Sequence, residues 1–117
     1  MKNPIAIAVI ALLLVILAAQ AQESIAKVTA LSSGKLLLNG QPSNLAAIES
    51  AFKLLSNTHG GVWYYREMSQ TEPPREAMAI IDLVVKYRLP VSLSSKPDFS
   101  DYIDEKGDSR PRKRLQP

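Results

Sequence analysis

The sequence predicts an α/β fold: a two-layer sandwich with a four-stranded mixed sheet and two helices on one face, in the order β-β-α-β-α-β. Three observations predict it. Two segments, 45–57 and 74–87, repeat apolar residues at helical spacing. Shorter segments between and around them are rich in β-branched and aromatic residues. Glycine, asparagine and proline separate these segments at positions typical of turns and helix ends.

The first half of the domain is expected to form a hairpin followed by a helix. Residues 27–32 and 35–39 are strand-like, and a Ser-Gly turn signal separates them. A second turn is expected at residues 39–42. Asn44 or the serine before it then caps a helix that ends near Asn57.

The second half is expected to be a strand, a helix and a returning strand. Residues 62–66 have the highest β propensity in the chain, and a helix follows over 74–87. Leu89-Pro90 ends that helix, and residues 91–94 alternate like a strand. Because a helix joins these two strands, we expect them to be parallel. Two helices cover only one face of such a sheet, so the other face should be largely uncovered.

The N-terminus is typical of an export signal. Ile5 to Ala19 is an unbroken run of 15 apolar residues, followed by the small-polar-small triplet Ala19-Gln20-Ala21. As a helix the run would span about 22 Å, which is short of a bilayer core of roughly 30 Å. We expect an exported, periplasmic protein whose leader is cleaved after Ala21. The alternative is an inner-membrane anchor with the domain facing the periplasm.

Four segments follow from these patterns. Residues 1–21 are a signal peptide or short membrane anchor, 22–26 a linker, 27–105 the folded domain and 106–117 a basic, disordered tail. The formal net charge of +3 is unevenly placed, since residues 22–105 carry ten acidic and eight basic groups. The folded part is therefore not expected to bind nucleic acid.

The order and spacing of these elements resemble the periplasmic domain of the ExbD/TolR biopolymer-transport family. The residues that carry the resemblance are the hairpin turn at Gly34, the second turn at 39–42, Leu45 leading the first helix, the strand from Val62, Ala79-Ile80-Ile81-Asp82, and the returning segment Leu89–Ser94. The resemblance covers residues 27–95. It implies a non-enzymatic module that works by protein or cell-wall contact, with inner-membrane transport proteins among its partners.

The leader departs from that family. The family's membrane helix carries an aspartate needed for proton-driven work, whereas Ile5 to Ala19 contains no ionisable residue. The resemblance therefore implies the periplasmic fold without the proton-handling part, and no catalytic residue is carried over.

The candidate catalytic and metal-binding residues can each be explained without a catalytic or metal-binding role. The absence of cysteine excludes disulfides and thiolate sites. His59 stands beside two glycines at a helix end, where the helix dipole favours a cation. The acidic residues from Asp98 to Asp108 are spaced unlike a calcium loop. We expect no catalytic residue, no metal and no cofactor. The less favoured alternative is a small secreted hydrolase.

Trp63, Tyr64, Tyr65 and Arg66 are the candidate interface residues. Side chains alternate along a strand, so Trp63 and Tyr65 share one face and Tyr64 and Arg66 the other. Whichever set meets the uncovered face should bind a second copy, a membrane transport protein or a cell-wall polymer. The competing interpretation is that both sets are packing in a thin domain. The basic residues 110–114 fit either a lipid or polymer contact or a solubilising tail.

Overall fold

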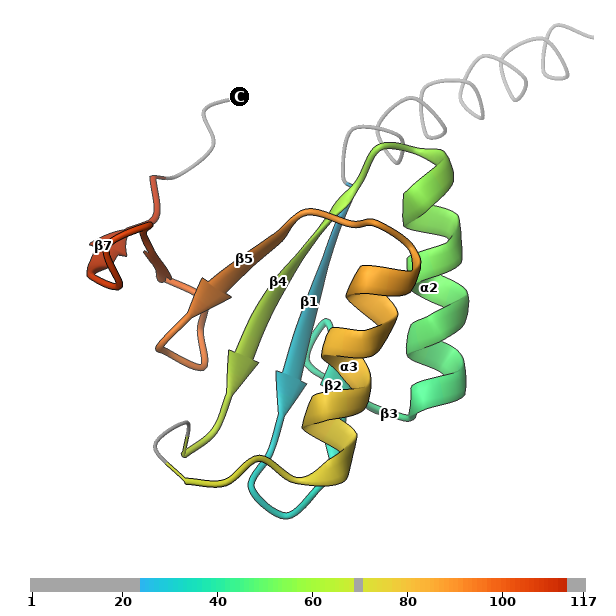
Figure 1. Ribbon diagram of the computed structural model, residues 1–117, viewed down its shortest axis with the longest axis horizontal. Helices are drawn as coiled ribbons and strands as arrows, with labels where there is room; N and C mark the ends of the chain where they lie inside the picture. The colour runs from blue at the N-terminus through green and yellow to red at the C-terminus, as the bar shows by residue number, and fades with distance from the viewer. Residues whose placement is uncertain (1–23, 69–70, 114–117) are drawn as a thin grey trace, which may run out of the picture.

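The computed structural model describes residues 24–68 and 71–113 (Figure 1). The described chain forms one mixed sheet with two helices and a separate two-stranded hairpin near its C-terminal end. The expected leader, residues 1–21, lies outside the described residues. Within the part that is described, no helix has the length and apolarity needed to cross a membrane.

The sheet confirms the α/β class but has five strands instead of four. They are β1 (Ile25–Ala30), β2 (Leu36–Leu38), β3 (Gln41–Ser43), β4 (Gly61–Arg66) and β5 (Val91–Ser94), in the spatial order β3-β2-β1-β4-β5. The hairpin of β1 and β2 is antiparallel, as expected. β4 pairs in parallel with β5, also as expected, and with β1 on its other side.

β3 is the strand that the sequence prediction missed, because residues 39–42 were expected to form only a turn. Asn39 and Gly40 are both left-handed, with φ of 52° and 82°. That is the geometry of a two-residue turn that reverses the chain into an antiparallel strand. Gln41 therefore pairs directly with Leu38. Pro42 is tolerated here because β3 is an edge strand, whose outer side needs no amide donor.

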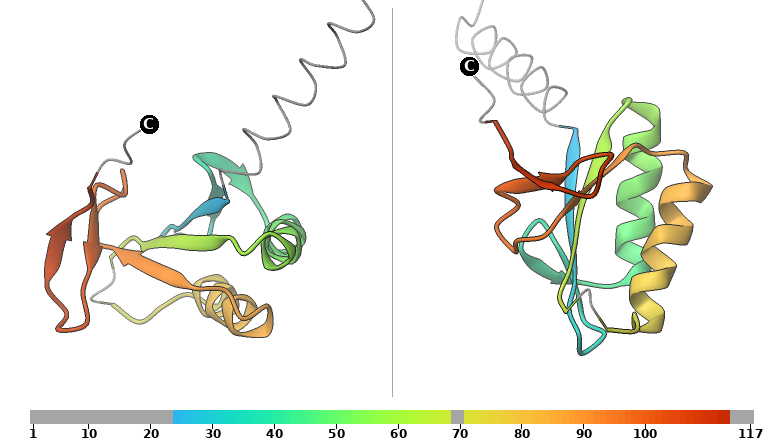
Figure 2. Two further views of the ribbon diagram at one scale, coloured as in Figure 1. Left: turned by 90° about the horizontal axis from the view of Figure 1, so that it is seen from above. Right: turned by 60° about the vertical axis from the view of Figure 1, so that its left-hand side comes forward.

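Both helices lie on one face of the sheet, as expected (Figures 1 and 2). α2 (Leu45–Asn57) begins at Asn44, whose side-chain oxygen accepts a hydrogen bond of 2.8 Å from the amide of Ala47. α3 (Arg75–Lys86) begins after Pro74, where a missing amide proton costs nothing. The helices are joined at their surface by Glu49 on α2, which accepts hydrogen bonds from Lys86 and Tyr87.

The hydrophobic core fills the space between the helices and the sheet. Its most deeply buried side chains come from both layers: Val28, Ile48, Phe52, Val62 and Ile80. Apolar residues recur at helical spacing in α2 and α3 because each helix buries one stripe against the strands.

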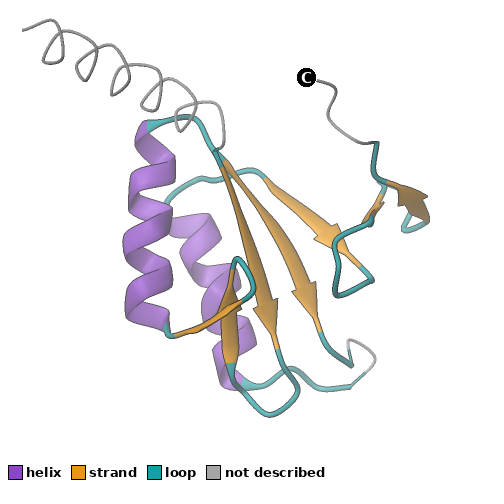
Figure 3. Ribbon diagram, turned by 180° about the vertical axis from the view of Figure 1, so that it is seen from behind, coloured by secondary structure: helices purple, strands orange, loops and turns teal. Residues whose placement is uncertain are grey.

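The C-terminal segment differs most from expectation. β6 (Asp101–Ile103) and β7 (Ser109–Pro111) form an antiparallel hairpin beyond β5, on the side of the sheet away from the helices (Figures 2 and 3). The prediction of a disordered tail over 106–117 was therefore wrong for residues 106–113. We call residues 95–113 the C-terminal arm.

Local hydrogen bonds explain why so polar a segment forms a hairpin. The carboxylate of Asp104 accepts from the backbone amides of Lys106 and Asp108, and Gly107 takes a φ of 85° at the turn. Asp98 accepts in the same way from the amide of Ser100. Asp98 and Asp104 therefore stabilise turns of the arm.

We expect Ile80→Ala to lower the free energy of unfolding by about 2–5 kcal/mol, because Ile80 is fully buried between helix and sheet. Met78→Ala on the same helix is the matched control, since half of the Met78 side chain is exposed, and it should cost less than about 0.5 kcal/mol. Urea unfolding followed by circular dichroism measures both. Equal losses for the two variants would contradict the orientation of α3.

Candidate functional site

The aromatic residues of β4 divide between the two faces of the sheet. Tyr64 lies under the helices, only 6% exposed, and its hydroxyl donates to the carbonyl of Ala77 at 3.4 Å. Burial raises the pKa of Tyr64. Trp63 and Tyr65 point to the opposite face, which no helix covers. We call this second surface the open face.

Neighbouring strands extend the open face on both sides of β4. Trp63 lies between Lys27 of β1 and Ser92 of β5 in the strand register. Tyr65 lies between Thr29 and Ser94, one pair further along the same strands. The open face is therefore a mixed surface of aromatic rings, hydroxyls and one lysine.

Arg66, the fourth candidate interface residue, ends β4. Its guanidinium donates to the carbonyl of Thr71 at 3.1 Å and so ties the strand to the loop before α3. The four candidates therefore do not share one surface, because Tyr64 is buried in the core and only Trp63 and Tyr65 belong to the open face.

Trp63 is covered by the C-terminal arm. The guanidinium carbon of Arg112 lies 3.8 Å from the centre of the Trp63 ring, and the Lys27 ammonium lies 5.3 Å from it. The ring of Phe99 is tilted against the indole, with 6.4 Å between centroids. A cation over an indole face is attracted by the ring's electron density, most strongly where water is excluded. Trp63 is consequently only half-exposed.

Arg112 is fixed in this position by hydrogen bonds to both the sheet and the arm. It donates to the carbonyls of Phe99 and Asp101 at 3.0 and 2.9 Å. It also donates to the hydroxyls of Ser92 and Ser94 on β5, at 3.1 and 2.9 Å. The planar fork of arginine can satisfy all of these acceptors while stacking on the indole, which lysine cannot do.

Asp101 is a buried carboxylate at the base of the arm, only 2% exposed. It accepts hydrogen bonds from the amide and hydroxyl of Ser95 and from the hydroxyl of Ser109 at 2.6 Å. Desolvation alone would raise its pKa, but the hydrogen bonds from Ser109 and Ser95 outweigh that effect and lower the pKa to about 2. Asp101 is therefore ionised in the folded state and links Ser95 to Ser109 within the arm.

Phe99, Asp101 and Arg112 were not predicted from the sequence to belong to this site. One signal was available, because the turn residues around Gly107 separate two short segments and so permit a hairpin. Nothing in the local pattern places Arg112 on Trp63, since the two residues are far apart in sequence and no hydrophobic periodicity links them.

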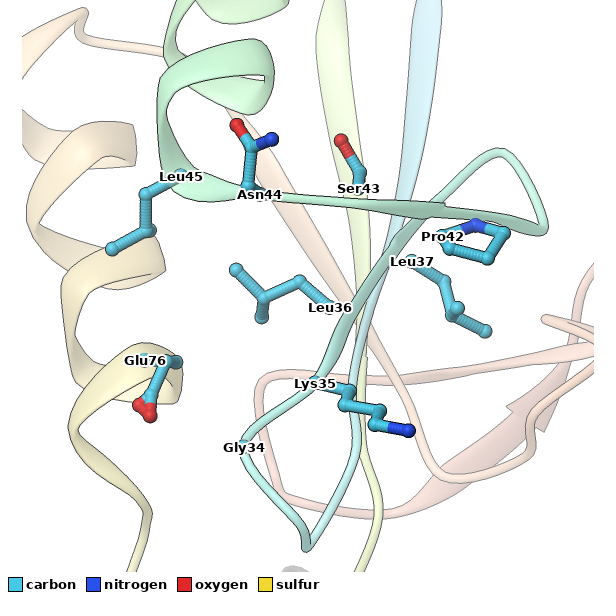
Figure 4. Close-up of a pocket in the computed structure, with 9 residues that line it drawn as sticks. All are labelled: Gly34, Lys35, Leu36, Leu37, Pro42, Ser43, Asn44, Leu45 and Glu76. Atoms are coloured by element: carbon cyan, nitrogen blue, oxygen red, sulfur yellow. The ribbon is translucent and has the colours of Figure 1, made fainter.

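A hollow of about 540 Å³ lies at another part of the fold, between the β2–β3 hairpin and the start of α3 (Figure 4). Leu36 and Leu45 give it apolar walls, and Glu76 supplies a carboxylate. Lys35 also lines it, but its side chain points away from Glu76 in Figure 4. The hollow has the volume of a small-molecule site but not the convergent polar groups that orient a substrate.

Among the described residues, no group of three or more histidine, aspartate or glutamate side chains is placed to hold a metal ion. Comparison with models of known families, with curated proteins and with solved structures gave no match.

Arg112→Ala should lower the free energy of unfolding by about 2 kcal/mol or more, because it removes the stack on Trp63 and four charge-assisted hydrogen bonds. Trp63 is the only tryptophan, so its emission should also shift to the red as water reaches the ring. Lys113→Ala, next to it and exposed, should change neither quantity. Unchanged emission in the Arg112 variant would contradict the observed stack.

The stability of the arm should depend on pH through Asp101. Its pKa falls from 3.8 to about 2 on folding, so the ionised form is favoured in the folded state. The resulting stability, on the order of 2 kcal/mol, is present above the unfolded value and is lost as the pH falls through the folded one. Trp63 emission of the parent should shift to the red across this interval.

Asp101→Asn isolates that effect from the other carboxylates. The variant should show the red-shifted emission already at neutral pH and should lack the acid step. Glu105→Gln changes an exposed acid on the same hairpin and serves as the control. An Asp101→Asn protein that kept the parental acid transition would show that another group controls the arm.

Proposed function

We propose that the chain is a non-enzymatic, exported binding module of the ExbD/TolR type, which works by protein or cell-wall contact through the open face. The observation that carries this proposal is the aromatic sheet surface that the two helices leave uncovered. Tyr65 and the part of Trp63 that the C-terminal arm leaves exposed combine apolar rings with hydrogen-bonding tips, which suits a contact surface. Ile25, 40% exposed, extends the apolar part of the same face.

A membrane-anchored accessory subunit of a transport complex is the second candidate. It is favoured by the apolar run Ile5 to Ala19, which ends only five residues before Ser24, where the described chain begins. In both cases the same open face makes the contact, and the second candidate adds an anchor. A small secreted hydrolase is less favoured, because the open face carries no histidine or paired carboxylates to act as acid and base.

We expect the protein to self-associate or to bind cell-wall sacculi through the open face. Trp63→Ala should weaken that association by about 2 kcal/mol or more. Because Trp63 also holds the arm, Tyr65→Ala provides a second variant on the same face. Leu54→Ala, a 69% exposed apolar residue on α2, should have no effect. Analytical ultracentrifugation and co-sedimentation with sacculi measure the two kinds of association.

The proposal fails under one clear result. If the parent stays monomeric at high concentration and leaves sacculi unbound, while Trp63→Ala only loses thermal stability, then Trp63 serves packing alone. In that case the loss of folding stability should reach about 3–5 kcal/mol, as for other core aromatic truncations.

A further inference from the structure

The two helices end in the same type of cap. At the end of α2 the amide of Gly60 donates to the carbonyl of Leu55 at 3.0 Å. At the end of α3 the amide of Leu89 donates to the carbonyl of Val84 at 3.1 Å. Both are the long hydrogen bond of a Schellman motif, which requires a left-handed residue just before the donor.

Glycine is the usual residue at that left-handed position, but here the positions hold His59 and Arg88, with φ of 56° and 52°. A side chain with a Cβ atom is strained in this conformation, and glycine is not. Both side chains are exposed, so packing does not explain them. Asn39, Met68 and Phe99 are left-handed too, so positive φ alone assigns no function, and what distinguishes His59 and Arg88 is that each closes a helix at the same end of the domain.

The two caps lie next to each other at one end of the domain. Residues of both loops line a common hollow of about 430 Å³, in which His59 and Arg88 are accompanied by the apolar side chains Leu55, Leu89 and Pro90. We call this end, residues 55–60 and 87–90, the basic end. The hollow therefore combines the Arg88 guanidinium, an imidazole and apolar groups.

The chain enters the fold at the basic end. The carbonyl of Ser24 accepts a hydrogen bond of 2.8 Å from the amide of Gly61, so β1 starts beside these caps (Figures 1 and 3). Four residues, 20–23, lie between Ala19, the end of the apolar run, and Ser24. The five Cα–Cα steps from Ala19 to Ser24 reach only about 17 Å even when the chain is fully extended.

The charge of this end is favourable for an anionic surface. Residues 50–66 and 83–97 contain no aspartate or glutamate. The two helix C-termini together contribute about one negative charge, which the full charge of Arg88 balances. The net positive charge of this end therefore comes from Lys53, one turn before the end of α2, because Lys86 is paired with Glu49.

We propose that the basic end docks on the anionic headgroup surface of a lipid membrane, with Arg88 and His59 contacting lipid phosphates. A guanidinium and an imidazole donate hydrogen bonds to phosphate oxygens, and the apolar wall of the hollow fits the glycerol and upper acyl region. This contact goes beyond the proposed function and does not use the open face. With the starting ends of β1, β4 and β5 next to the bilayer, the open face would stand upright on the membrane and remain free for its own contact.

The absence of cysteine allows a clean test with the full-length chain. A fluorophore that responds to polarity is attached to Thr58→Cys, and the protein is reconstituted in phosphatidylcholine vesicles with or without phosphatidylglycerol. The label should report docking only when phosphatidylglycerol is present. A second label, at Asn57→Cys, repeats the measurement and controls for any change that Thr58→Cys makes to the helix cap.

Arg88→Gln should reduce the ratio of docked to undocked protein about fivefold, as expected for the loss of one basic residue at an anionic surface. Arg75→Gln removes the same charge from the opposite end of α3 and should have no effect. Arg88→Gly should reduce docking equally while raising the melting temperature, because glycine relieves the left-handed strain. A loss of docking together with a higher melting temperature distinguishes lipid contact from a purely structural cap.

Three results would overturn the inference. The label could respond equally in vesicles with and without phosphatidylglycerol. Arg88→Gln and Arg88→Gly could leave docking unchanged, or Arg75→Gln could reduce it as much. Finally, inorganic phosphate could reverse docking where chloride of equal ionic strength does not, which would assign the hollow to a free anion. None of these outcomes depends on the contact proposed for the open face.

Discussion

The architecture depends on one constraint: two helices cover one face of a five-stranded sheet and leave the other to be covered by something else. In this chain the other face receives the C-terminal arm, and the contact that holds it there is the guanidinium of Arg112 stacked on Trp63. The stack joins the strand with the highest β propensity to the most basic segment of the chain. A surface expected to be open is therefore partly occupied by the chain itself.

The arm is held by polar groups more than by apolar burial. It forms its own two-stranded sheet, and its links to β5 are the hydrogen bonds of Ser94 and Arg112 and the buried charge of Asp101. Such a network is stable only when every member is satisfied, and no buried side-chain polar atom of the described residues lacks a partner. The arm is thus tied to Trp63 through a few specific side chains, while Ile25 and Lys27 on the open face stay exposed.

Hydrophobic spacing was sufficient to predict both helices, because each buries an apolar stripe. The cap at Asn44 followed from its residue type, and the parallel pairing of β4 with β5 followed from the helix that joins them. β3 escaped prediction because Gln41, Pro42 and Ser43 have little strand propensity, although the Asn-Gly pair before them favours an immediate reversal. The arm escaped for a different reason. Its order comes from long-range hydrogen bonds of Arg112 and Asp101, and local sequence patterns carry no information about such partners.

The proposed function requires that the chain makes its contacts through the sheet face opposite the helices. Amide chemical shifts of the isotope-labelled protein, followed as its concentration rises and as soluble cell-wall fragments are added, test this claim most directly. We expect the shift changes to concentrate on the open face, at Trp63, Tyr65 and Lys27, while the amides on the outer surfaces of α2 and α3 stay unchanged. Shifts confined to the outer helix surfaces, or none in either titration, would contradict it.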